Sequence, residues 1–92
     1  MQLRWTSTAA DDLEIIANYL FDKAPENAAR LIREIYNAPT TLKNFPNRGR
    51  AGKKEGTREL VMPSLPYIIV YHVRGDTVHI VRILHSSQDW PR

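Results

Sequence analysis

Apolar residues recur at helical spacing through the first part of the chain, after a short alternating segment. Polar and apolar positions alternate over residues 2–5, which predicts a first strand. Thr6 or Thr8 is a suitable N-cap for a helix over about residues 7–23, because a threonine hydroxyl can accept from a free backbone N–H. The apolar stripe of this helix consists of Leu13, Ile16, Ala17 and Leu20.

A second helix is predicted to begin at Pro25, since the first position of a helix does not need the N–H that proline lacks. The short separation from the first helix predicts an antiparallel hairpin whose apolar stripes form core. Pro39 interrupts the pattern, and a proline inside a helix costs about 3 kcal/mol or more. The helix therefore either kinks at Pro39 or ends near Asn37, with Pro39 opening a further turn. Its apolar stripe consists of Ala28, Leu31, Ile32 and Ile35.

The last third of the chain contains three runs rich in β-branched and aromatic residues. They span residues 58–62, 67–74 and 77–85, and Gly75-Asp76 is a two-residue hairpin signal between the last two. The middle run is apolar on both faces until His72, which is typical of a central strand. A loop over residues 44–56, rich in asparagine and glycine, precedes the runs.

These elements predict an α+β fold of the order β-α-α-β-β-β. It comprises an N-terminal strand, an antiparallel helical hairpin packed on one face of the sheet, and a three-stranded antiparallel meander. With 92 residues, the chain has room for a single domain, residues 1–92. There is no apolar run of the roughly 20 residues that span a membrane and no secretory signal, so a cytoplasmic location without membrane attachment is expected. The lack of cysteine excludes disulfide and thiolate chemistry.

The net charge of +3 is unevenly distributed. Residues 1–47 carry five basic and six acidic side chains, whereas residues 48–92 carry eight and four. Within residues 48–58, Glu55 is the one acidic residue that opposes five basic ones: Arg48, Arg50, Lys53, Lys54 and Arg58. Such a cluster can bind phosphate or an acidic protein surface. The alternative is a solvated loop whose charges keep the chain in solution.

Arg82 and His85 are the residues of the last strand that a sheet core does not require. With regular alternation, Arg82 and Leu84 share one face and His85 lies on the other. Arg82 is either a preorganised phosphate ligand or a snorkelling side chain that pairs with a carboxylate such as Glu59. His85 is either a general acid or base or a histidine bonded to nearby backbone. A site that both share requires a bulge, or an end of the strand near Leu84.

Other chemistries lack support in the sequence. We find no metal-ligand spacing, no phosphate-binding glycine motif and no nucleophile elbow, and we expect neither metal nor cofactor. If the chain is an enzyme, cation-assisted phosphodiester cleavage suits it best. In that reaction arginines stabilise the charged transition state while another group moves a proton.

Four segments, in this order and spacing, resemble the RelE/ParE superfamily of toxins from type II toxin–antitoxin modules: WTSTAADDLEIIANYL, FPNRG, RELVMPSLPYIIVYHV and VHIVRILHSSQDW. The match covers nearly the whole chain, and Arg-Ile-Leu-His with the following Asp89 looks more like the ParE branch. The resemblance implies a cytoplasmic toxin of a plasmid stabilisation module that arrests growth and is neutralised by a cognate antitoxin. A homodimer or a toxin–antitoxin hetero-oligomer is the assembly to expect.

The target is where the superfamily divides. ParE-type members inhibit DNA gyrase without performing chemistry, and this is the favoured interpretation. RelE-type members are metal-independent endoribonucleases (mRNA interferases) that cleave mRNA at the ribosome. A third alternative is an inert module that binds its antitoxin or nucleic acid.

The RelE-like alternative implies specific roles for charged residues of this chain. Arg58 and Arg82 match phosphate-binding arginines, and His85 or Glu55 would supply the acid or base. The basic loop would contact RNA through Arg48, Arg50, Lys53 and Lys54.

Overall fold

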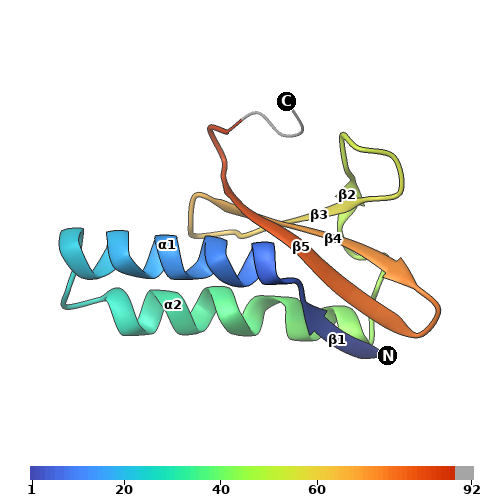
Figure 1. Cartoon of the computed structure of the whole chain (residues 1–92), viewed down its shortest axis with the longest axis horizontal. Coiled ribbons are helices and arrows are strands. Elements are labelled where there is room, and N and C mark those ends of the chain that lie inside the picture. The colour runs from blue at the N-terminus through green and yellow to red at the C-terminus, as the bar shows by residue number, and fades with distance from the viewer. Residues whose placement is uncertain (89–92) are drawn as a thin grey trace.

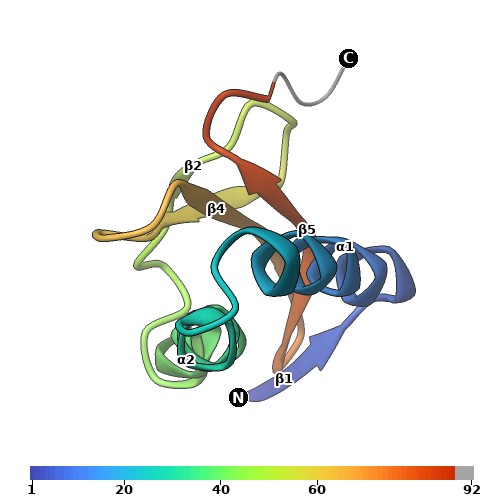
Figure 2. The same ribbon diagram turned by 90° about the vertical axis from the view of Figure 1, so that its left-hand side faces the viewer.

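The computed structural model describes residues 1–88. Both long helices lie side by side on one face of a sheet, as Figures 1 and 2 show. The predicted α+β fold, with its helical hairpin and antiparallel meander, is confirmed. The elements in chain order are β1 (Gln2–Trp5), α1 (Ser7–Lys23), α2 (Ala28–Asn37), the 3₁₀ helix η1 (Ala38–Lys43), β2 (Arg50–Ala51), β3 (Arg58–Val61), β4 (Tyr67–Arg74) and β5 (Thr77–His85).

The described strands form one mixed sheet in the order β1-β5-β4-β3-β2. β1 runs parallel to β5, with Gln2 opposite Thr77, and the other neighbours are antiparallel. Gly75, at φ +58°, occupies the first position of the two-residue turn between β4 and β5, as a type II′ hairpin requires. The sequence did not predict β2, which consists of two residues within the predicted loop over residues 44–56.

The helix boundaries follow from local hydrogen bonds. The backbone N–H of Ala9 donates to the Thr6 hydroxyl (3.1 Å), which confirms Thr6 as the N-cap of α1. The prediction that the second helix begins at Pro25 is wrong. The Asn27 N–H donates to the Ala24 carbonyl (3.0 Å), so a closed turn occupies residues 24–27 and α2 begins after it. At the other end α2 stops at Asn37, and Pro39 lies in η1, so the second of the two alternatives holds.

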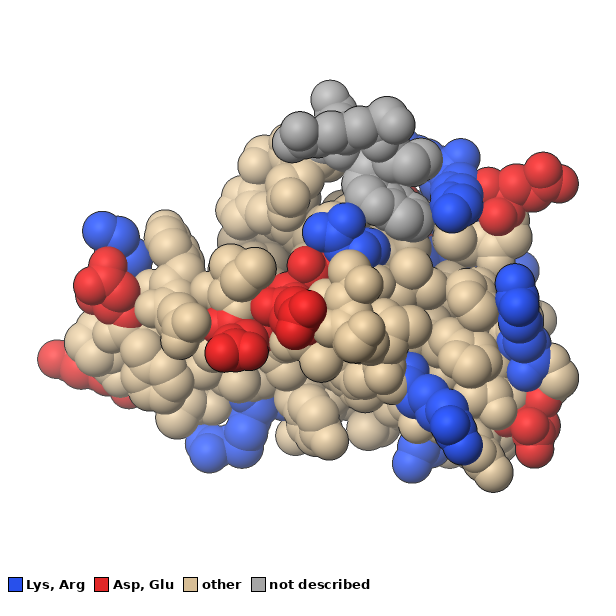
Figure 3. Space-filling model, viewed as in Figure 1, with Lys and Arg blue, Asp and Glu red and all other residues tan. Residues whose placement is uncertain are grey.

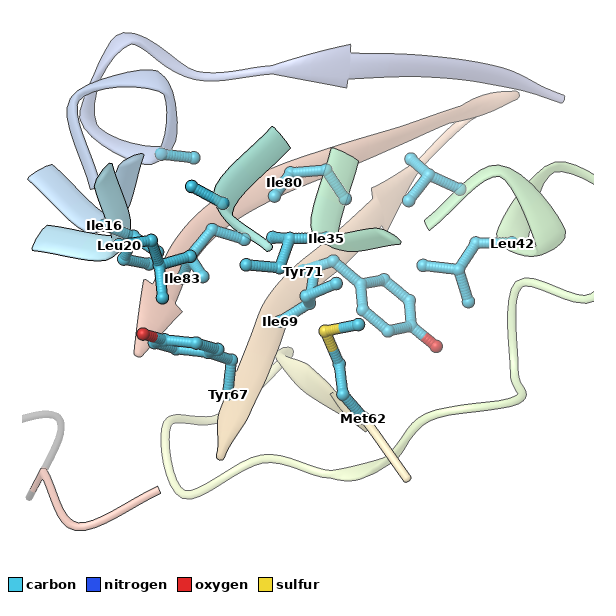
Figure 4. Packing of buried hydrophobic residues seen from close by; sticks show 13 residues of the cluster. Ile16, Leu20, Ile35, Leu42, Met62, Tyr67, Ile69, Tyr71, Ile80 and Ile83 are labelled. Atoms are coloured by element: carbon cyan, nitrogen blue, oxygen red, sulfur yellow. The ribbon is translucent and has the colours of Figure 1, made fainter. Parts of the chain in front are cut away.

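The core lies between the helices and the inner face of β4 and β5. Tyr71 is its largest fully buried side chain. The Tyr71 hydroxyl donates to the Pro46 carbonyl (2.7 Å) and accepts from the Gly49 N–H (2.9 Å), so it fixes the loop before β2. Figure 4 shows the side chains around it, which include Ile16, Leu20, Ile35, Leu42, Met62, Tyr67, Ile69, Ile80 and Ile83.

A bulge in β5 overturns the regular alternation expected for this strand. Tyr71 is opposite Ile80, but Val70 is opposite Arg82, so Val81 is an extra residue. Beyond it Ile83, rather than Leu84, takes its place with Ile80 in the core cluster. The pattern of residues could not show this shift, because one inserted position exchanges the two faces of everything that follows.

Candidate functional site

Arg82 and Asp12 form a two-pronged ion pair between β5 and α1. Arg82 Nε donates to Asp12 Oδ2 (2.7 Å) and Nη2 donates to Oδ1 (3.2 Å). Asp12 Oδ2 also accepts from the backbone N–H of Ile83 (2.9 Å). The interpretation of Arg82 as a cation paired with a carboxylate is therefore correct, but its partner is Asp12 and not Glu59. A chain separation of 70 residues hides this partner from sequence reasoning.

The pair has a structural reason at the edge of the sheet. The register of β1 with β5 ends at Ile80, so Ile83 has no strand neighbour on that side among the described residues. Asp12 satisfies this N–H and the guanidinium together. Side-chain exposures of 27% for Arg82 and 12% for Asp12 make the pair mostly buried. The hydrogen bond to Asp12 raises the pKa of Arg82 and the negative charge adds to this, although burial opposes them.

Arg50 and Arg58 are also engaged by the chain itself. Arg50 Nε donates to Glu59 Oε1 (3.0 Å), and Arg50 Nη2 lies 2.9 Å from the same oxygen in an ion pair. Glu59 is only 7% exposed. Arg58 donates from Nη1 to the carbonyl of Gly49 (2.9 Å) and, more weakly, to that of Asn47 (3.4 Å). Through these contacts, both arginines hold the basic loop in place.

His85 lies at the end of β5 in a hydrogen-bonded turn. The N–H of Ser87 donates to His85 Nδ1 (3.2 Å), so a neutral ring carries its proton on Nε2. The ring meets Tyr67 edge-on, with centroids 5.8 Å apart. His85 is opposite Tyr67 and Arg82 is opposite Val70, so the two point to opposite faces of the sheet.

Arg82 and His85 nevertheless line one groove, because the Arg82 side chain turns toward Asp12 and α1. This groove between α1 and the ends of β4 and β5 measures about 700 Å³. Ile15 and Tyr19 stand in its wall with 67% and 57% exposure. Burial in the first place, and Tyr19 in the second, raises the pKa of Tyr67, which keeps its hydroxyl protonated.

The apolar wall of the groove is a feature that sequence reasoning missed. Ile15 and Tyr19 are one helical turn apart, and they lie outside the stripe of α1 that was predicted to form core. A second apolar stripe on a helix that already has one is a signal that could have identified this surface.

The remaining predicted residues lie elsewhere. Figure 3 shows several Lys and Arg side chains at the end of the molecule where Figure 1 places the β4–β5 hairpin and the turn between β2 and β3. Glu55 and Lys54 are exposed in the turn between β2 and β3, where both line a second hollow beside His72. Arg48 lines a third pocket together with Phe45. Within residues 1–88 no three histidine or acidic side chains are grouped as a metal would require. No helix in the same part of the chain has the length and apolarity to cross a bilayer.

Comparison with known proteins decides the family. The sequence model described as the ParE toxin of the type II toxin–antitoxin system parDE matches residues 3–90. This chain belongs to the ParE toxin family. The resemblance to the RelE/ParE superfamily is confirmed, although Asp89, part of the motif that suggested the ParE branch, lies outside the described residues.

Relatives of this ParE-family chain include a toxin named Y4kP and a toxin with a RelE name. The Y4kP protein of Sinorhizobium fredii is 38% identical over 91 residues, covering 99% of this chain and 94% of that protein. Toxin RelE2 of Caulobacter vibrioides is 36% identical over 87 residues, covering 95% and 97%.

Solved structures similar to this chain come from both a ParDE and a RelBE system. The chromosomal ParDE toxin–antitoxin system of P. aeruginosa contains a chain with a TM-score of 0.86 and 30% identity, covering 92% of this chain and 95% of that one. The RelBE2 toxin–antitoxin complex of Mycobacterium tuberculosis contains one with a TM-score of 0.64 and 25% identity, covering 95% and 92%. The greater structural similarity is to the ParDE system.

Proposed function

We propose that this type II toxin arrests growth by ParE-like inhibition of DNA gyrase and is neutralised by a cognate antitoxin. The observation that carries the proposal is the engagement of Arg82 by Asp12. A nuclease of the RelE kind needs preorganised cations aimed at the charge that develops on the transferred phosphate. Here the carboxylate already occupies both prongs of the guanidinium, so the arginine anchors α1 instead.

Arg50 and Arg58 support the same conclusion. Glu59 neutralises Arg50, and two loop carbonyls hold Arg58. A set of arginines that stabilises the fold of the chain itself is suited to binding a target and not to chemistry on one. Gyrase is a cytoplasmic target, so the proposal includes a cytoplasmic location and a role in plasmid stabilisation or its chromosomal counterpart.

The groove beside α1 suits the antitoxin. Its wall offers the exposed side chains of Ile15 and Tyr19 with Leu31 and Leu65, while Arg82 and His85 supply polar groups at one end. An amphipathic segment that inserts apolar side chains spaced one helical turn apart matches such a surface. Toxin–antitoxin complexes among the solved relatives, ParDE and RelBE2, support a partner of this kind.

Ribosome-dependent mRNA cleavage is the second candidate function. Its specific support is that Arg82 and His85 line one groove, and that two relatives are named RelE toxins. In this case target binding would have to displace Asp12 from Arg82, with His85 or Glu55 as acid or base. Arg48, Arg50, Lys53 and Lys54 would then contact RNA and Arg58 a phosphate.

Two assays on the purified toxin separate the candidates. In the first, gyrase supercoils relaxed plasmid in the presence of increasing toxin; in the second, ribosomes carrying mRNA are incubated with the toxin. We expect loss of supercoiling with intact mRNA. Cleaved mRNA with unimpaired supercoiling would overturn the proposal in favour of the nuclease.

A matched variant sharpens this outcome. His85→Gln should lower nuclease activity by about 10²–10⁴-fold if His85 is the acid or base, and should leave gyrase inhibition unchanged. His79→Gln, on the opposite face of the sheet, is the control. If neither assay responds to the wild-type chain although it binds its antitoxin, the inert-module alternative is correct.

A further inference from the structure

A hollow of about 350 Å³ lies on the face of the sheet that the helices do not cover. His72 forms part of its floor, and it points away from the core because its neighbours Tyr71 and Val73 pack against the core cluster. The exposed side chains of Lys54 and Arg74 stand around it. The complete lining is Lys54, Glu55, Gly56, Thr57, His72, Val73, Arg74 and Val81.

The basic side chains of this hollow differ from the arginines described above. Among residues 1–88, neither the Lys54 ammonium nor the Arg74 guanidinium has an ion pair or hydrogen bond. His72 Nδ1 is buried and has no hydrogen-bond partner in the same residues. Buried polar nitrogens are normally paired. This cluster therefore combines two cations that have no counter-charge with an imidazole nitrogen that has no partner in the described part of the chain.

His79 places a second imidazole beside that of His72. It is opposite His72 in the β4–β5 register, and the two ring centroids are 5.0 Å apart. Two imidazoles at this distance could share a metal ion, but Lys54 and Arg74 repel a cation. Burial first, and then His79, Arg74 and Lys54, lowers the pKa of His72, as expected where the surroundings are positive.

We propose that this hollow binds a phosphate group, with Arg74 and Lys54 as counter-charges and His72 as a hydrogen-bond donor. Arginine suits the two-pronged contact with phosphate oxygens, and lysine supplies a point charge. The site goes beyond the proposed function, because it does not depend on whether gyrase or mRNA is the target. A free phosphate, a nucleotide or a nucleic-acid backbone would supply the same chemistry.

Glu55 allows a test of the proposal, because removing its charge should change the affinity for phosphate and for a metal ion in opposite directions. Its exposed carboxylate lines the same hollow and repels a phosphate. Removing this charge should therefore strengthen phosphate binding, whereas it would weaken a metal site that used the carboxylate as a ligand.

The experiment is an NMR titration of the full chain at constant ionic strength. The probes are inorganic phosphate, a 5′-mononucleotide and a dinucleotide with one phosphodiester. We expect saturable shifts at Thr57, His72 and Arg74, and comparison of the probes identifies the phosphate class. Arg74→Gln and Lys54→Gln should each weaken binding about threefold to tenfold, and Glu55→Gln should tighten it about two- to fivefold. Arg33→Gln, exposed on α2, should change nothing.

A second readout separates binding in the hollow from general attraction to a basic protein. Bound phosphodiester should raise the pKa of His72 by favouring its charged form. The charged and titratable groups that face His72 are His79 from β5, Arg74 from β4, and Lys54 and Glu55 from the turn before β3; Arg4 on β1 is opposite His79. The diester does not itself titrate near neutral pH, so its affinity should increase as the pH falls below neutral.

The outcomes are decisive in either direction. Absence of saturation at about 20 mM of every probe would overturn the proposal, since even a millimolar site would be filled there. Equal binding by Arg74→Gln and the wild-type chain would also overturn it. Saturable binding of Ni²⁺ that His79→Gln and Glu55→Gln both abolish, without phosphate binding, would assign the hollow to a metal instead.

Discussion

Asp12 and Arg82 tie the second turn of α1 to the edge of β5, immediately after the bulge at Val81. The carboxylate accepts from both prongs of the guanidinium and from the N–H of Ile83. At the N-cap of the same helix, the Thr6 hydroxyl donates to the Ile80 carbonyl (2.8 Å). α1 and its N-cap therefore take the place of the strand that β5 lacks beyond Ile80, because Thr6 bonds to the Ile80 carbonyl and Asp12 to the Ile83 N–H.

The ion pair should contribute measurably to stability. We expect Arg82→Ala to lower the free energy of unfolding by about 1–3 kcal/mol, since hydrogen bonds to charged groups contribute about this much. Asp12→Ala should cost more, because it also leaves the Ile83 N–H without a partner. Urea unfolding of both variants and of the double variant measures the coupling, which should be about 1 kcal/mol or more. Additive effects would show that the pair contributes nothing beyond its separate contacts.

Arg82 also shows which inferences the sequence allows and which it does not. A guanidinium among valine, isoleucine and leucine signals a partner or a task, and that inference needs only the strand pattern. The identity of the partner does not follow, because Asp12 reaches Arg82 only through the bulge and through the packing of α1 on the sheet. Glu59 was the nearer choice along the chain, but β2 places Arg50 beside it.

The fold also has elements that the sequence predicts and elements that it does not. β4 and β5 were predicted with the bounds that the structure shows, since their β-branched runs and the Gly75-Asp76 turn are local signals. The parallel pairing of β1 with β5 and the two-residue β2 depend on contacts between distant segments. Local patterns cannot specify such contacts, and the hollow around His72 depends on them as well.

Thr6 should contribute more to the free energy of unfolding than a typical helix N-cap does. Its hydroxyl accepts from the Ala9 N–H and also donates to the Ile80 carbonyl, so it joins α1 to β5. We expect Thr6→Ala to destabilise the chain by about 1–2 kcal/mol, the upper part of the range for N-caps. Thr8→Ala is the matched control, because Thr8 is exposed in the first turn of the helix. Equal unfolding midpoints for the two variants would contradict the role assigned to Thr6.

Tyr71 should be sensitive to the loss of one oxygen atom. In Tyr71→Phe the N–H of Gly49 and the carbonyl of Pro46 both lose their partner. We expect a cost of about 1–3 kcal/mol, as for buried polar groups left unpaired, and faster hydrogen exchange in the loop over residues 44–49. Tyr36→Phe is the control, since Tyr36 is 55% exposed. Unchanged exchange in this loop would show that the hydroxyl does not hold it.

The His72–His79 pair should make stability depend on pH in a window where few carboxylates titrate. The pKa of His72 in the folded chain lies below its ordinary value of 6.5, mainly through burial and then through His79 and two cations. The unfolded chain therefore binds more protons, and stability decreases as the pH falls through 6.5 toward the folded pKa. Urea unfolding at intervals between about pH 7.5 and pH 5.5 should show this decrease.

Substitution of one ring tests whether the pair is its source. His79→Gln removes one of the influences that lower the pKa of His72, so the loss of stability on acidification should become smaller than in the wild-type chain. His72→Gln should reduce it further, because burial acts on His72 itself. His85→Gln is the control, since His85 is exposed at the far end of β5. If the wild-type chain and His72→Gln lost stability equally between these pH values, the dependence would have to come from other groups.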